Sequence, residues 1–220
     1  MFSALILGYD PNTSLFFSGL STVVFFIVTG GRVPAYLGCS GSATSIILSI
    51  TGYDHTTMSG LNPNTSQVQG ALLILSISYA IVAVIVIIFG YTWLEFLMPP
   101  AIIGYTVHAI CGTKNIGPPI NYSEIVSSPW LRAPAIYYNL EFNGHSIGTM
   151  MPLLIVLLAE NLGHMKAIES ITTNEKPMVK YVGRAYLGDA FGCMMASLGG
   201  TIPFTTYADN IGVLVGYIIS

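Results

Sequence analysis

The feature that most constrains this chain is the length of its uncharged apolar runs. Residues 71–91 form a continuous apolar stretch rich in β-branched side chains, and no Asp, Glu, Lys or Arg lies between Asp54 and Glu95. An α-helix needs about 20 mainly apolar residues to cross the roughly 30 Å hydrocarbon core of a bilayer. Residues 71–91 therefore predict a transmembrane helix.

The composition extends this conclusion to the whole chain. Hydrophobic residues make up 53% of the sequence and charged residues 8%, with a mean hydropathy of +0.69. Soluble domains carry about 25% charged residues, so this chain has too few charges to coat a water-facing surface. A net charge of −3 provides no basic surface for nucleic acid. The sequence has no nucleophile, phosphate-binding, dinucleotide or zinc motif, so we expect neither an enzyme nor an organic or metal cofactor.

The gaps between charges predict an all-α polytopic protein with about seven spans in a single membrane domain, residues 1–220. The polar residues 113–146 are expected to form an external loop. Glu95 and Asp189 fall at expected span ends, where an interfacial role is the simplest. The expected spans are residues 15–29, 43–50, 71–91, 96–111, 147–164, 187–198 and 201–220.

The basic residues predict the orientation of these spans. Four of the seven, Lys166, Lys176, Lys180 and Arg184, fall in one loop between expected spans. Loops rich in Lys and Arg are retained in the cytoplasm, and alternation of the spans then puts Arg32 on the cytoplasmic side as well. We expect an integral, multi-pass protein of the plasma membrane.

Two of the expected spans begin with similar irregular segments. Val33-Pro34-Ala35-Tyr36 opens one and Ile202-Pro203-Phe204-Thr205 opens the other. Interrupted helices in corresponding halves of a transporter indicate its binding site, because non-helical backbone at membrane depth must be covered by protein or line a cavity. The competing interpretation is a pair of proline kinks in ordinary spans, and the segments alone favour neither.

Glu160 and His164 are the ionisable residues that lie deepest in an apolar segment. Glu160 lies 13 residues after Ile147, which is about 20 Å along a helix. His164 follows four residues later on the same helical face, where an imidazole and a carboxylate can share a proton. Intramembrane ionisable residues are functional by default. The alternative is that both extend toward the cytoplasmic end of the span, near Lys166.

Asp209 is the last charged residue of the chain and precedes a short apolar stretch, residues 211–213. An aspartate in this position is suited to capping a helix N-terminus. Capping and contact with a ligand are compatible roles, so both interpretations stay open.

Four groups of residues together resemble the nucleobase–ascorbate transporter family, also called nucleobase–cation symporters. They are Pro34-Ala35-Tyr36-Leu37-Gly38, Trp93-Leu94-Glu95 with Pro99-Pro100, Glu160-Asn161-Leu162-Gly163-His164, and Thr205 to Val213. The resemblance covers nearly the whole chain. It implies a transporter of fourteen spans in two inverted repeats of seven, divided into a core domain and a gate domain.

The resemblance also implies where the substrate binds. Short strands from the third and tenth spans of the family pair at the bilayer midplane, and our two irregular segments correspond to them. Glu160 would hydrogen-bond a nucleobase ring, and His164 would support it in proton coupling. The other implied substrate contacts are Asp209, Tyr207, Ala208, Gly41 and Ser42.

The implied function is proton-coupled uptake of a nucleobase or oxopurine, such as uracil, xanthine or uric acid, across the membrane. The proton is the expected coupling ion, with sodium left open. Oligomeric state is also open, with a homodimer among the arrangements allowed.

Three departures from the family pattern bear on this expectation. Asp209 is one methylene shorter than the usual glutamate, and Gly41 stands where uracil permeases carry an aromatic ring. The first, sixth and seventh spans and everything after the tenth have no counterpart here. The chain is thus expected to be a partial seven-plus-seven transporter, mostly core, with residues 93–112 as a gate-like span.

Two alternatives follow. One is a truncated membrane fragment that does not transport. The other is an anion carrier of the same fold, for which a glutamate at position 160 would be unexpected.

Overall fold

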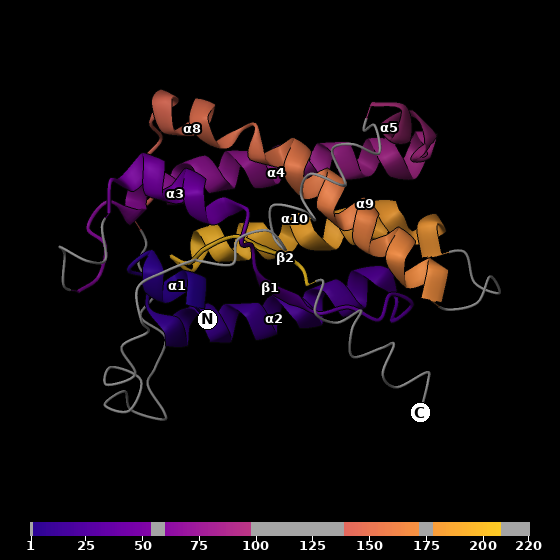
Figure 1. The fold of residues 1–220 in the computed structure, drawn as a ribbon, viewed down its shortest axis with the longest axis horizontal. Coiled ribbons are helices and arrows are strands. Elements are labelled where there is room, and N and C mark those ends of the chain that lie inside the picture. The colour runs from indigo at the N-terminus through magenta and orange to yellow at the C-terminus, as the bar shows by residue number, and fades with distance from the viewer. Residues whose placement is uncertain (1, 54–59, 98–138, 172–177, 208–220) are drawn as a thin grey trace, which may run out of the picture.

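The structure is a computed structural model that describes residues 2–53, 60–97, 139–171 and 178–207 (Figure 1). These residues form helices and two short strands. In chain order the elements are α1 (Phe2–Ile6), α2 (Pro11–Thr29), β1 (Leu37–Cys39), α3 (Ala43–Thr51), α4 (Thr65–Phe89), α5 (Thr92–Leu97), α8 (Gly144–Met150), α9 (Leu153–Ile171), the 3₁₀ helix η1 (Met178–Tyr181), α10 (Val182–Leu198) and β2 (Phe204–Thr206).

Three helical segments among the described residues are long and apolar enough to cross a membrane. They are Pro11–Thr29, Thr65–Phe89 and Gly144–Glu169, and each contains or closely overlaps an expected span. The third comprises α8 and α9, which are separated at Met151 and Pro152. Pro152 lacks the N–H that would continue the helical ladder, and the sequence analysis missed this break. Most of the expected span 96–111, from residue 98 on, and most of the span 201–220 lie outside the described residues.

Capping residues fix the ends of α2, the first long helix. Asp10 accepts a hydrogen bond from the Thr13 backbone N–H at 3.1 Å and so caps the N-terminus, with Pro11 at the first helical position. Both residue types are preferred there. Gly30 ends the helix with a φ of 68°, a left-handed conformation that glycine adopts without strain.

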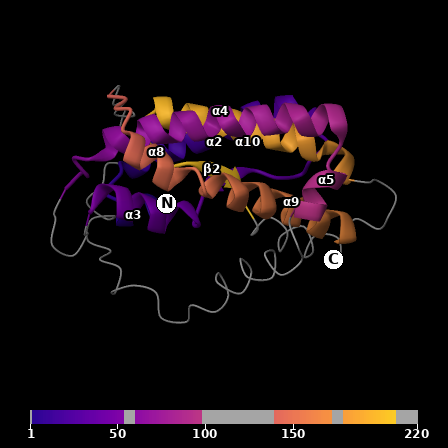
Figure 2. The same ribbon diagram turned by 90° about the horizontal axis from the view of Figure 1, so that it is seen from above.

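The described helices form two layers with the strands between them. Figure 2 shows α2, α4 and α10 in one layer and α3 and α9 in the other. α10 packs closely against its neighbours because glycines line its sides. A Cβ atom built on Gly188 would lie 2.6 Å from the Phe25 ring of α2, and one on Gly183 would lie 2.6 Å from Ile87 of α4. Small residues at helix contacts allow this close approach in membrane proteins.

The two irregular segments form an antiparallel pair of strands. β1 and β2 align Leu37 with Thr206 and Cys39 with Phe204. The pairing continues beyond one end, where the Ser40 N–H donates to the Pro203 carbonyl at 2.9 Å. The interpretation as broken, non-helical segments is therefore confirmed over the simple proline kinks.

Helix α2 satisfies the backbone of β1 on its other edge. The Leu37 N–H donates to Thr22 Oγ1 at 3.1 Å, and Ser18 Oγ donates to the Leu37 carbonyl at 2.6 Å. An unpaired backbone group in an apolar interior costs several kcal/mol. These hydroxyl groups thus allow a strand to lie between membrane helices.

Candidate functional site

Glu160 lies half-buried in α9 and faces the segment that follows β1. Its Oε2 atom accepts a hydrogen bond from Ser42 Oγ at 3.3 Å. The Ser42 hydroxyl also lies 2.8 Å from Ser40 Oγ. The first irregular segment therefore brings one hydroxyl group to the carboxylate and a second hydroxyl group next to the first.

His164 contacts the second irregular segment instead. Its Nδ1 atom lies 3.2 Å from Thr206 Oγ1 in β2. Within the described part of the chain, Glu160 and His164 share no hydrogen bond, so the proton sharing expected from their spacing is not direct here. Glu160 and His164 therefore each contact a different one of the two irregular segments.

The structure describes two of the other expected contact residues, Gly41 and Tyr207. Gly41 is exposed, and a Cβ atom built on it would meet nothing within 4 Å. Tyr207 stacks on Tyr36 with ring centroids 5.8 Å apart and ring planes 21° apart. Ala208 and Asp209 lie outside the described residues.

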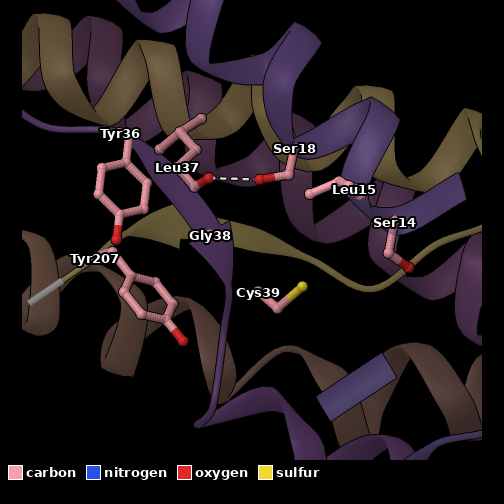
Figure 3. A pocket seen from close by; sticks show the side chains of 8 residues that line it. All are labelled: Ser14, Leu15, Ser18, Tyr36, Leu37, Gly38, Cys39 and Tyr207. Carbon is pink, nitrogen blue, oxygen red and sulfur yellow. Dashed lines mark hydrogen bonds between the residues drawn. The ribbon is translucent and has the colours of Figure 1, made fainter. Parts of the chain in front are cut away.

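A cavity of about 180 Å³ lies between α2 and the strands (Figure 3). Of the expected contact residues that the structure describes, Tyr207 alone lines it. Neither Glu160 nor Ser42 lines it, so it does not include the hydrogen-bonded polar groups described above. We place the candidate site at Glu160 and Ser42, where the polar groups meet. The cavity is lined by Ser14, Leu15, Ser18, Tyr36, Leu37, Gly38, Cys39 and Tyr207.

Asp189 corrects one prediction from the sequence. It was expected at a span end, but its exposed fraction is 0% and it lies in the middle of α10. Its Oδ2 atom accepts hydrogen bonds from Asn161 Nδ2 at 2.5 Å, Tyr79 Oη at 3.4 Å and Thr205 Oγ1 at 3.5 Å. The spans were predicted in the gaps between charged residues, so Asp189 was treated as the end of a span. It lies instead inside a glycine-lined helix.

A comparison with family models decides which family this arrangement belongs to. The model of the Permease family matches residues 3–113 and 112–215, which is nearly the whole chain. This chain belongs to the nucleobase–ascorbate transporter family. The two matched segments meet at residues 112–113.

Relatives of this chain are named as pyrimidine or uracil permeases, which agrees with the nucleobase–ascorbate transporter family. The chain is 28% identical to the putative pyrimidine permease RutG of Escherichia coli strain K12, covering 96% of this chain and 60% of the relative. It is 26% identical to the uracil permease of Bacillus caldolyticus, covering 97% of this chain and 63% of that permease. It is 22% identical to the uracil permease of Escherichia coli strain K12, covering 97% of this chain and 62% of that permease.

The chain spans about 60% of the length of the first of these relatives. That alignment extends over 269 positions, more than the 220 residues of this chain, so the relative carries residues that have no counterpart here. Family and apolar helices together identify an integral, multi-pass membrane protein. The three relatives are permeases by name, which makes them transporters rather than enzymes.

Proposed function

We propose that this chain binds a nucleobase at Glu160 and takes part in its proton-coupled uptake across the cell membrane. The observation that carries the proposal is the position of Glu160, half-buried on α9 and hydrogen-bonded to the segment after β1. Several relatives are named uracil or pyrimidine permeases, which favours a pyrimidine such as uracil. Oxopurines such as xanthine and uric acid present similar ring N–H and carbonyl groups and are the second choice.

In this proposal the carboxylate of Glu160 accepts hydrogen bonds from ring N–H groups of the base. Ser42 and Gly41 face the base from the first irregular segment, and Tyr207, Ala208 and Asp209 contribute from the second. A site of this kind discriminates strongly, because a base that lacks a matching donor leaves a buried polar group unpaired.

Glu160 also provides a means of proton coupling, with His164 in support. A carboxylate in an apolar surrounding is costly unless it is paired or protonated. A proton on His164, one turn along the same helical face, would stabilise the Glu160 carboxylate that binds the base, so the proton and the base would favour each other's binding. Sodium is the alternative coupling ion.

We also propose that the architecture is a partial seven-plus-seven inverted repeat with about seven spans. In this arrangement residues 93–112 form a gate-like span and residues 113–146 an external loop. The antiparallel pairing of β1 with β2 supports it, because antiparallel strands are related by a two-fold axis, as the halves of an inverted repeat are.

Uptake of radiolabelled uracil, xanthine and urate by cells producing the full chain tests the function. We expect uptake of at least one base that rises with a proton gradient, and its loss in Glu160→Gln. Glu141→Gln is the control, since Glu141 is an exposed glutamate whose carboxylate contacts Ser66. Undiminished uptake by Glu160→Gln would contradict the assigned role.

A second candidate function is a membrane fragment that binds but does not transport, alone, as a homodimer or with a full-length relative. The share of the relatives that the chain spans favours it. Binding of a nucleobase to the purified chain together with no uptake in cells would select this alternative.

A further inference from the structure

A buried polar cluster joins four elements behind the candidate site. Asp189 of α10 lies at its centre, and its Oδ2 atom accepts hydrogen bonds from Asn161 of α9, Tyr79 of α4 and Thr205 of β2. Asp189 and Asn161 are both fully buried. Asn161 is adjacent to Glu160 in the sequence. The cluster therefore connects the carboxylate of the candidate site to the layer formed by α2, α4 and α10.

Two oxygen atoms of this cluster have no hydrogen-bond partner among the described residues. They are Oδ1 of Asp189 and Oδ1 of Asn161, and both are buried. Buried polar atoms are almost always paired, and leaving one unpaired costs about 1–3 kcal/mol. As long as Asp189 is ionised, both oxygens are acceptors and neither can satisfy the other.

The groups that face Asp189 include no positive charge within the described residues. Tyr79 faces it from α4, Tyr186 and Cys193 lie near it on α10, and Glu160 of α9 is close enough for its charge to repel that of Asp189. α2 presents the uncharged Phe25 and Ser21 to the neighbouring turns of α10. The Thr206 amide of β2 approaches the carboxyl group but leaves Oδ1 unpaired.

A single hydrogen atom shared between these two oxygens would pair both of them. A carboxylic acid and a carboxamide can form a ring of two hydrogen bonds, in which the amide N–H donates to one acid oxygen and the acid O–H donates to the amide oxygen. The first of these bonds is present, from Asn161 Nδ2 to Asp189 Oδ2. The second requires a proton on Asp189 Oδ1.

We propose that Asp189 is a second proton-binding residue, protonated in this conformation, whose acid O–H donates to Asn161 Oδ1. This inference rests on the proposed function for its role in transport, though not for the presence of the proton. Loss of the proton would open the acid–amide ring and place a second negative charge near Glu160. Because Asn161 neighbours Glu160 and Thr205 belongs to β2, the protonation state of Asp189 would bias the position of both sides of the candidate site.

Infrared spectroscopy of the purified full chain, without substrate, tests the proton directly. A protonated carboxyl group has a C=O band that a carboxylate lacks. We expect this band at neutral pH in the wild type, its loss in Asp189→Asn, and its presence in Glu160→Gln. Asp189→Asn should fold, because an asparagine at position 189 can form the same two-bond ring with Asn161.

Asn161→Leu provides an independent variant. It removes the acceptor of the acid O–H, so the C=O band should shift while the buried volume changes little. An Asp189→Asn spectrum identical to that of the wild type, or an unshifted band in Asn161→Leu, would overturn the proposal. The wild-type spectrum is recorded with choline as the buffer cation and again with sodium. Loss of the band in sodium would also overturn the proposal, since the cluster would then hold a metal cation.

The transport role has a separate readout. Asp189→Asn should still bind the nucleobase while its uptake loses the dependence on external pH that the wild type shows. A wild-type pH profile in Asp189→Asn would contradict the coupling role. If the wild type takes up no nucleobase, the proposed function fails, yet the infrared result still decides whether Asp189 holds a proton.

Discussion

At the scale of single residues, two glycines three positions apart have opposite surroundings. A Cβ atom on Gly38 would lie 2.3 Å from the Tyr207 ring, whereas one on Gly41 would meet nothing within 4 Å. We predict that Gly38→Ala lowers stability by about 1–3 kcal/mol, the usual cost of overpacking, because Tyr207 must leave its stack on Tyr36. Thermal unfolding in detergent measures this. Gly41→Ala is the matched control, and an equal effect of both changes would contradict the prediction.

The open space at Gly41 leads to a prediction about affinity. Gly41→Phe would add an aromatic face beside Ser42 and Glu160, and stacking of a base on an aromatic ring contributes about 1–3 kcal/mol. We expect nucleobase binding to tighten at least about fivefold, because about 1.4 kcal/mol corresponds to tenfold. Equilibrium binding of labelled base measures the change. Gly41→Leu, which adds bulk without a ring, should not tighten binding.

Sequence reasoning found some of the site residues and missed others for a physical reason. Glu160 and His164 were identifiable because a charge within a long apolar run stands out. Asp189 was missed, since a charge near the edge of a short apolar run looks like an interface residue. Its burial depends on Asn161 and Tyr79, which come from other helices, and no local pattern reveals such partners.

At the scale of elements, prolines and β-branched residues marked both irregular segments. The strands themselves have three residues each, too few for an alternating pattern to register. Their pairing was expected from the family resemblance rather than from spacing. The pairing joins residues that are far apart in the chain, so it depends on tertiary contacts. Helix α2 contacts β1, and α10 contacts β2.

Close packing of α10 against α2 gives a prediction at this scale. Gly188→Ala would place a Cβ atom 2.6 Å from the Phe25 ring and 3.3 Å from its Cα atom, so the helices must separate. We expect a loss of about 1–3 kcal/mol in stability, measured by thermal unfolding in detergent. Gly148→Ala in α8 is the control, because nothing lies within 4 Å there and alanine favours helix by up to about 1 kcal/mol. Equal destabilisation by the two changes would argue against the packing role.

At the scale of the whole molecule, the basic residues predict how the chain lies in the membrane. Lys180→Cys should react with a membrane-impermeant thiol reagent only from the cytoplasmic side, and Glu141→Cys only from outside. Both positions are exposed. A Cys111→Ser background suits the experiment, since the other two native cysteines, Cys39 and Cys193, are buried. Labelling of both positions from the same side would contradict the orientation.

The membrane class and the family were predictable from composition and motifs, because lipid as a solvent leaves a strong compositional signature. The number of spans was less accessible. Three candidate spans fall within the described residues, and the apolar segments 98–111 and 208–220 are outside them.

Binding of tritiated uracil and xanthine to the purified full chain tests most directly whether Glu160 belongs to a nucleobase site. Glu169→Gln is the matched control, because Glu169 also lies on α9. A hydrogen bond to a charged group contributes about 1.5–3 kcal/mol, so Glu160→Gln should weaken binding by about tenfold or more, while Glu169→Gln binds like the wild type. Wild-type protein that binds neither base, or equal binding by both variants, would contradict the assignment.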